Sequence, residues 1–280
     1  MRVALIQMSV TAQKAANLDV AEERIRAAKA AGADLAVLPE MFCCPYDTGC
    51  FRAYGEESGG EARTRLAAVA KEQSIYLVGG SIPELAEGKV YNTAFVFGRD
   101  GAQLARHRKL HLFDIDIDGG QRFMESDTLS PGDDITTFET EFGIMGLCVC
   151  FDFRFPELAR LMAVRGAQVL FVPGAFNLTT GPAHWELLFR QRAVDNQVFT
   201  VGVSPARDET AGYVAYGNSM AVDPWGTVLC RAGGEDVTLY ADLELSQIGD
   251  VRRQLPLLSA RRTDLYELRE RLDSPETDEF

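Results

Sequence analysis

The chain has 280 residues, of which 46% are hydrophobic and 25% are charged. This balance is typical of globular proteins and excludes disorder for most of the chain. Its 28 basic and 41 acidic residues give a formal net charge of −13, which argues against nucleic acid as a partner because phosphate is bound by positive surfaces. No apolar run approaches the roughly 18 residues that cross a membrane, and the initial MRVALIQMSV does not fit a signal peptide. We therefore expect no membrane partner either.

The cysteine and histidine content predicts reduced thiols rather than a disulfide or metal framework. A domain of this length does not need disulfides, and the cysteine spacings do not fit ordinary zinc sites. Only three histidines are present. We expect a cytoplasmic protein without a metal, in which most thiols are buried as small apolar groups. The six cysteines are Cys43, Cys44, Cys50, Cys148, Cys150 and Cys230.

In chain order, short apolar runs predict buried strands, and apolar residues at helical spacing predict helices. Asn17 is expected to cap the first helix, which Gly32 can end. Asp100-Gly101 is expected to join two strands as a hairpin. The expected strands are 3–6, 35–38, 75–78, 93–97, 103–106, 143–150, 169–172, 199–203, 220–222, 227–230 and 239–241, and the expected helices are 17–31, 62–71, 156–164 and 183–194.

Strands alternate with helices, and hairpins are interspersed among them. This pattern favours an α/β fold with mixed sheets over a purely parallel, doubly wound sheet. The sequence shows no linker, internal repeat or low-complexity stretch, so a single domain over 1–272 is expected. Residues 273–280 are acidic and include a proline, which predicts a loose C-terminal tail.

Polar groups follow three of the predicted strands, at the positions where α/β proteins place their sites. Glu40 follows an apolar run, and Lys109 ends the basic stretch Arg106-His107-Arg108-Lys109. Cys150 lies where a strand turns sharply into a helix, which is the geometry of a nucleophile elbow. Taken singly, each residue also fits an ordinary role, as a loop carboxylate, a solvated basic loop or a buried thiol.

The chemistry of a cysteine nucleophile links the three positions. A thiol attacks an acyl carbon as thiolate, so its pKa must be lowered or a base must take its proton. None of the three histidines has a clear claim to that role, and His184 at a helix start is expected to be a structural hydrogen bonder. A glutamate base beside a lysine can do the same work, because the lysine stabilises both the thiolate and a tetrahedral oxyanion.

Three motifs in this order resemble the Glu-Lys-Cys triad of the nitrilase (carbon–nitrogen hydrolase) superfamily. They are Leu38-Pro39-Glu40, the stretch 108–114 and the stretch 146–154. The resemblance runs from Val3 to about Tyr266, which is nearly the whole chain. Within the superfamily the chain looks most like the ω-amidase branch, on the stretches 111–116, 129–133, 173–186, 195–198 and 204–208.

The resemblance implies a four-layer α-β-β-α sandwich with two mixed sheets, in a protein that dimerises helix to helix. It implies hydrolysis of the terminal amide of 2-oxoglutaramate or 2-oxosuccinamate to the 2-oxo dicarboxylate and ammonia, without a metal or organic cofactor. In this family's pattern Cys150 is the nucleophile, Glu40 the general base and acid, and Lys109 the oxyanion stabiliser. The backbone N–H of Phe151 would be the second oxyanion donor, and Glu125 would support the triad.

The substrate's distal carboxylate needs a local cation, since the chain as a whole is acidic. Arg154 lies four residues after the nucleophile, and a guanidinium suits a carboxylate. Thr180 precedes a helix start, where free N–H groups favour an anion. Phe176 could wall the pocket, and the family resemblance supports all three residues. The alternative for Arg154 is a structural salt bridge to Glu157.

The sequence departs from the family pattern at two positions and carries one extra thiol. Asn218 stands where the family has histidine in a Tyr-Gly-His-Ser stretch, and His107 stands where tyrosine is usual. Both are expected to bear on substrate preference. Cys148 lies two residues before the nucleophile, and on a strand that spacing means the same face. It could therefore lie beside the active site.

Other functions remain open at this point. An amidase acting on deaminated glutathione shares the triad and the stretch 181–186, although 176–180 favours ω-amidase. The triad alone does not exclude a true nitrilase. A non-catalytic binding protein on this scaffold would normally lack a member of the triad. A papain-like hydrolase would need a histidine partner and a different fold.

Overall fold

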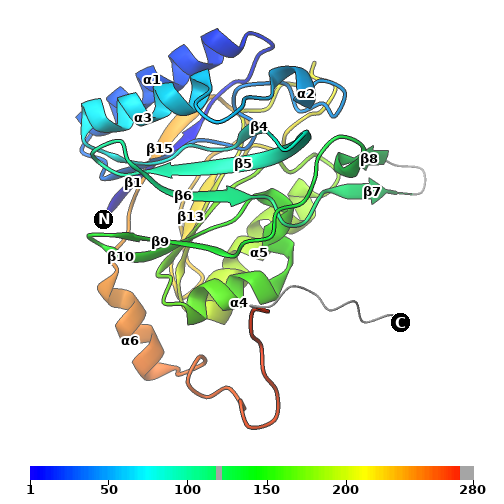
Figure 1. Cartoon of the computed structure of the whole chain (residues 1–280). Coiled ribbons are helices and arrows are strands. Elements are labelled where there is room, and N and C mark those ends of the chain that lie inside the picture. The colour runs from blue at the N-terminus through cyan, green and yellow to red at the C-terminus, as the bar shows by residue number, and fades with distance from the viewer. Residues whose placement is uncertain (118–121, 272–280) are drawn as a thin grey trace.

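Two β-sheets face each other in the computed structural model, which describes residues 1–117 and 122–271 (Figure 1). The first sheet has the order β15-β1-β2-β3-β5-β4, with β6 beside β5. Its strands are β1 (Arg2–Gln7), β2 (Leu35–Val37), β3 (Tyr76–Val78), β4 (Ile82–Ala86), β5 (Lys89–Phe97), β6 (Gln103–Arg108) and β15 (Val237–Asp242).

The second sheet has the order β14-β13-β12-β11-β10-β9. Both sheets are mixed, because parallel pairs at their centres are flanked by antiparallel pairs. The strands of the second sheet are β9 (Thr136–Thr140), β10 (Gly143–Leu147), β11 (Val169–Pro173), β12 (Phe199–Val203), β13 (Met220–Val222) and β14 (Val228–Arg231). A separate ribbon pairs β7 (Asp114–Asp116) with β8 (Arg122–Met124).

Helices cover the outer face of each sheet, which confirms the expected four-layer sandwich (Figure 1). Helices α1 (Lys14–Ala30) and α3 (Glu61–Gln73) pack on the first sheet, and α4 (Pro156–Val164) and α5 (Gly181–Asn196) pack on the second. Two further helices are α2 (Phe51–Tyr54) and α6 (Ser246–Gln254). The predicted tail over 273–280 and the domain boundary at 272 lie outside the described residues.

The first strand shows why the sequences of the central strands are continuous apolar runs. Val3 and Leu5 pack into the core between the two sheets, whereas Ala4 and Ile6 pack into the core beneath α1 and α3. Successive side chains of a strand point to opposite faces, so a strand covered on both faces needs apolar residues throughout. Burying a leucine or isoleucine side chain contributes about 1.5–3 kcal/mol, so these runs anchor the layers.

The first helix and the strand before Cys150 differ from the sequence expectation, and several helices and strands are additional to it. The first helix begins at Lys14, and Asn17 does not cap it: its buried side chain accepts hydrogen bonds from Thr11 N–H and Oγ1. The strand expected over 143–150 ends at Leu147, because Cys150 has a left-handed backbone with φ of 50°. The additional elements, which the sequence pattern does not indicate, are α2, α6, β4, β7, β8 and β9.

Candidate active site

Glu40 is held at the carboxyl end of β2 by two loops that approach closely. Gly80 has φ of 60°, and a Cβ there would lie 2.2 Å from the carbonyl oxygen of Pro39. Only glycine permits that approach. The N–H of Met41 donates to Ser81 Oγ at 3.0 Å. These contacts fix the position of the Glu40 carboxylate, which is completely buried.

Lys109 directly follows β6 and points its ammonium group into the same buried space. Its Nζ donates to Glu40 Oε1 at 3.0 Å and lies 2.9 Å from Glu125. All three side chains are fully buried. Tyr46 completes the group, because its hydroxyl donates to Glu125 at 2.5 Å and lies 3.2 Å from Glu40. Glu125 also accepts the N–H of Phe113 at 2.7 Å, so it is tied to the chain that carries Lys109.

One oxygen of the Glu40 carboxylate remains available to accept a proton. Asn92 donates to the Oε1 atom at 2.8 Å, the atom that also accepts from Lys109. The Oε2 atom is buried and has no hydrogen-bond partner among the described residues. Since an unpaired buried acceptor is costly, this atom is poised to accept a proton.

Cys150 is presented at a tight turn between β10 and a short 3₁₀ helix over Cys150–Arg154. Its φ of 50° is unusual for a residue with a side chain and costs of the order of 1–3 kcal/mol. This is the strand-to-helix elbow that the sequence predicts. The N–H of Ala175, at the end of β11, points at the Sγ atom of Cys150 at 3.5 Å.

Asp152 ties the elbow to the Lys109 segment. Its completely buried carboxylate accepts five hydrogen bonds. The N–H groups of Leu110 and His111 donate from the residues that follow Lys109, and the N–H of Val149 donates from the residue before Cys150. The remaining two bonds come from the rings of His107 (Nε2) and His111 (Nδ1), at 2.9 and 2.8 Å. One carboxylate therefore sets the relative position of the lysine and the cysteine.

The electrostatics of the buried group keep Cys150 protonated at rest. Burial and the charge of Glu40 raise the pKa of the Cys150 thiol well above its ordinary value. Burial also raises the pKa of Glu40, although Lys109 opposes that shift. Burial lowers the pKa of Lys109, but the carboxylates of Glu125 and Glu40 outweigh it, and the net shift is upward. The resting site thus holds a thiol, an ammonium group and a carboxylate with increased proton affinity.

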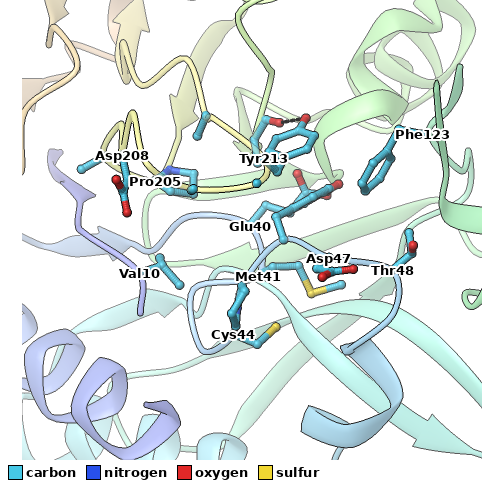
Figure 2. A pocket seen from close by; sticks show the side chains of 17 residues that line it. Val10, Glu40, Met41, Cys44, Asp47, Thr48, Phe123, Pro205, Asp208 and Tyr213 are labelled. Carbon is cyan, nitrogen blue, oxygen red and sulfur yellow. Dashed lines mark hydrogen bonds between the residues drawn. The ribbon is translucent and has the colours of Figure 1, made fainter. Parts of the chain in front are cut away.

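Two cavities share Ala175 and Tyr213 in their linings, and Cys150 lines one of them. The outer cavity, in which Glu40 lies, is shown in Figure 2. It is lined by Val10, Glu40, Met41, Cys44, Pro45, Tyr46, Asp47, Thr48, Phe123, Ala175, Pro205, Ala206, Asp208, Ala211, Gly212, Tyr213 and Ala215. The inner cavity is lined by Phe113, Cys150, Phe151, Arg154, Ala175, Phe176, Thr180 and Tyr213.

The inner cavity brings together all four residues that the sequence suggested for substrate binding. The Arg154 guanidinium lies 4.4 Å from the ring centre of Phe176 and 5.6 Å from that of Phe151. It bonds to His184 Nδ1 at 3.0 Å rather than to Glu157. Thr180 also lines the cavity, but its N–H and hydroxyl donate to Asn177 Oδ1.

The departures from the family pattern lie outside both cavities. Cys148 is completely buried in the core and lines neither cavity in the described part of the chain. His107 is likewise buried, between Asp152 and Thr136. The side chain of Asn218 accepts from Arg231.

Four further residues belong to the site but are not indicated by the sequence pattern: Tyr46, Asp152, Ala175 and Tyr213. Asp152 is separated from Glu40 and Lys109 by long stretches of chain, and its partners come from three segments. Only its position two residues after Cys150 could have marked it. Tyr213 belongs to a loop without periodicity, and its role depends on contacts that the fold creates.

Within residues 1–117 and 122–271, no cluster of three His, Cys, Asp or Glu side chains could hold a metal ion. None of the six cysteines forms a disulfide. The helices of the described ranges all lack the length and apolar character needed to cross a membrane.

Known proteins resemble this chain in sequence and in fold. The family model "Carbon-nitrogen hydrolase" matches residues 2–253. The chain is 55% identical to the Omega-amidase NIT2 of Mus musculus over 265 residues, which covers 95% of this chain and 96% of the mouse protein. Nit3 of Saccharomyces cerevisiae, a member of branch 10 of the nitrilase superfamily, has a crystal structure that matches with a TM-score of 0.87 at 42% identity, over 94% of this chain and 96% of the yeast chain.

A structural neighbour of lower sequence identity is modified at its active site cysteine. The amidase from Nesterenkonia sp. AN1 matches with a TM-score of 0.77 at 28% identity, over 95% of this chain and 98% of that chain. Its structure, a glutamate-to-glutamine mutant, shows the result of Michael addition of acrylamide at the active site cysteine. Sequence, fold and the matched length agree, and this chain belongs to the carbon–nitrogen hydrolases of the nitrilase superfamily.

Proposed function

We propose that the chain is an ω-amidase, a hydrolase that converts 2-oxoglutaramate or 2-oxosuccinamate to the 2-oxo dicarboxylate and ammonia. The observation that carries the proposal is the buried Glu40–Lys109–Glu125 group beside the Cys150 elbow, with Arg154 in the adjoining inner cavity. The 55% identity to the mouse Omega-amidase over 95% of the chain supports the same substrate class.

Acylation begins with a proton transfer. Glu40 Oε2 accepts the Cys150 thiol proton as Sγ attacks the amide carbon, and the C=O electrons move onto oxygen. Lys109 and the N–H of Phe151 stabilise that oxyanion. When the intermediate collapses, Glu40 returns the proton to the nitrogen and ammonia leaves. Because burial favours the protonated form of Glu40, the carboxyl is a competent base and acid in turn.

Deacylation uses the same groups with water. Glu40 takes a proton from water, and the oxygen attacks the thioester carbon beside the same oxyanion donors. Collapse breaks the C–S bond and Glu40 returns the proton to Sγ, and the carboxylic acid product loses its own proton to solvent to become the carboxylate. In this proposal Glu125 holds the Lys109 ammonium in place and does not touch the substrate.

Arg154 gives the site its preference for a distal carboxylate. The guanidinium Nε is buried without a hydrogen-bond partner among the described residues, and its ion-pair partner is therefore expected to be the substrate. Phe176 walls the cavity behind it. Thr180 is proposed to contribute a donor at the start of α5 by exchanging its bond to Asn177 for one to the substrate.

An ammonia-release assay tests the function. Purified protein is incubated with 2-oxoglutaramate, 2-oxosuccinamate, deaminated glutathione and a simple nitrile, and ammonia and the carboxylate product are measured. We expect the two 2-oxo acid amides to be the best substrates. Faster turnover of deaminated glutathione would favour the related amidase, turnover of the nitrile would favour a nitrilase, and no turnover of any of them would favour a binding protein.

We also propose that the protein is a cytoplasmic homodimer with one hydrolase domain over 1–272. Six unpaired thiols suit a reducing compartment. The outer face of α5 exposes Leu187, and the nearby turn exposes Trp225, at 60% and 61%. A second copy of the chain packed on this face, helix against helix, would bury both side chains.

A further inference from the structure

Tyr213 stands between the two cavities. In the described part of the chain it is one of two residues, with Ala175, that line both of them. Its hydroxyl donates to the carbonyl oxygen of Ala175 at 2.5 Å, and the N–H of Ala175 points at Cys150 Sγ. The tyrosine ring is therefore held at a fixed position relative to the nucleophile, through a single residue.

The ring of Tyr213 is also fixed from the outer side. It packs on Tyr46 with ring centres 4.5 Å apart and on Phe123 at 5.3 Å. Figure 2 shows Tyr213 and Phe123 beside Glu40 at one end of the outer cavity, with Pro205 and Asp208 farther along it. The outer cavity has a volume of about 400 Å³, whereas the inner cavity is closed by its lining side chains, which must move apart to admit an acyl chain.

The direction of the substrate follows from the charged groups. The carboxylate of the acyl chain needs Arg154, which lines only the inner cavity. The nitrogen that leaves must receive a proton from Glu40, which lines only the outer cavity. A substituent on that nitrogen would therefore extend from Cys150 towards the outer cavity and meet the ring of Tyr213.

We propose that Tyr213 is a specificity-determining residue that restricts the leaving group to ammonia. Ammonia is small enough to leave without displacing the ring, whereas a larger amine requires the ring to move away from Ala175, Tyr46 and Phe123. This inference rests on the proposed function, because it takes the acyl chain to be a 2-oxo dicarboxylate. It explains how one triad could serve either a primary amide or an amide whose leaving group is a peptide.

The test varies only the leaving group. 2-Oxoglutaramate, its N-methyl amide and deaminated glutathione share one acyl chain and release ammonia, methylamine and the dipeptide Cys-Gly. In Tyr213→Ala we expect the ratio of kcat/KM for each N-substituted amide to that for the primary amide to rise at least about tenfold, since a missing or extra group in a pocket changes discrimination by roughly 10–200-fold. Tyr213→Phe is the matched control, which keeps the ring but loses the bond to Ala175, and its ratios should stay within about threefold of those of the unmodified protein.

Several outcomes would overturn the proposal. If Tyr213→Ala slows all three amides equally, the tyrosine is a packing residue. If Tyr213→Phe shifts the ratios as much as Tyr213→Ala, the hydroxyl and not the ring is responsible. Should Tyr213→Ala fail to fold, Tyr213→Leu gives the same comparison with an intermediate volume. Failure of the proposed function would be seen separately, as unmodified protein that does not release ammonia from 2-oxoglutaramate, and the ratio would then be measured with the primary and N-methyl forms of whichever amide is hydrolysed.

Discussion

At the scale of single residues, the site carries more negative than positive charge. Glu40 and Glu125 share the one ammonium group of Lys109. A thiolate would add a second uncompensated charge to this buried group, which is why the pKa of Cys150 is raised and why its proton must pass to Glu40 as the attack occurs. In this respect the site differs from cysteine sites that hold a preformed thiolate.

The first prediction at this scale concerns the nucleophile. Cys150→Ala should lower kcat by several orders of magnitude, whereas Cys148→Ala should leave most of the activity, since Cys148 lines neither cavity. Mass spectrometry of denatured protein trapped during turnover should place the acyl group on a peptide through Cys150. An acyl group on Cys148 would contradict the assignment.

The second prediction concerns Arg154. A charge-assisted pair contributes about 1.5–3 kcal/mol, so Arg154→Met should lower kcat/KM for 2-oxoglutaramate roughly 10- to 150-fold, mainly through KM. An uncharged amide without the distal carboxylate should lose much less, because it never uses the contact. Equal losses for the two substrates would make the arginine structural, held there by His184 and Phe176.

At the scale of elements, the site depends on how the end of β6 meets the turn after β10. Neither segment is regular secondary structure where they touch, and the buried carboxylate of Asp152 supplies the hydrogen bonds that a strand partner would otherwise provide. Burial and hydrogen bonding shift the pKa of Asp152 in opposite directions. Burial alone would raise it, but the bonds from His107 and His111 hold it well below its ordinary value.

Replacing this carboxylate should therefore harm both stability and rate. In Asp152→Asn an amide N–H₂ faces N–H donors, so we expect a loss of about 2–5 kcal/mol in the free energy of unfolding, measured by urea denaturation. The turnover number should fall at least about a hundredfold with a smaller change in KM. His111→Phe, which keeps the stacking on Phe155 and removes one side-chain bond, should cost less than half as much stability.

The pH dependence of that loss has a defined sign. Because the folded-state pKa of Asp152 is lowered, its stabilisation is complete above the ordinary aspartate pKa of about 3.9 and declines as the pH falls below it. The difference in unfolding free energy between the unmodified protein and Asp152→Asn should shrink on acidification below about pH 4. A difference that grows there would mean that Asp152 is not the ionised partner.

The sequence predicted the strands that are buried on both faces. Strands β1, β2, β3, β11 and β12 are covered on both faces, so their apolar runs marked them, and the polar residues at the ends of β2, β6 and β10 marked the site. Strand β9 and helix α6 are covered on one side, and their mixed composition gave no comparable signal. Asn17 fits a cap by residue type, but the helix begins three residues earlier, and the Asn17 side chain bonds to Thr11 in the preceding loop.

Site residues that act across the fold could not be read from local pattern. Tyr46 and Tyr213 stack on each other from loops far apart in the chain, and Ala175 acts through its backbone, which no residue type reveals. The catalytic candidates were recognisable because their motifs resemble a family. Their partners follow from the way two sheets bring those motifs together.

At the scale of the whole molecule, the proposed dimer predicts that a substitution in its interface changes the oligomeric state, and so the molar mass in solution. Leu187→Lys should weaken association at least about a hundredfold, because a leucine contributes about 1.5–3 kcal/mol and a symmetric interface contains it twice. Leu104→Lys on β6, a leucine exposed at 41% in the other sheet, is the matched control and should remain a dimer. Light scattering after size exclusion measures both. If the unmodified protein is monomeric, or if the Leu187→Lys variant stays dimeric, the proposed interface on this face of α5 is wrong.

The single carboxylate that joins the lysine segment to the elbow also has a consequence for hydrogen exchange. The amide protons of Leu110, His111 and Val149 lie outside the strands, yet all three are bonded to a group with no exposure to water. They exchange only when these bonds to Asp152 break, so we expect their opening free energy to match that of the core strands. Peptides spanning 108–112 and 148–152 should therefore take up deuterium as slowly as β1 and β11, and rapid uptake would show that this junction opens on its own. By this measure, we expect the amide protons of these turns to be among the slowest-exchanging in the molecule.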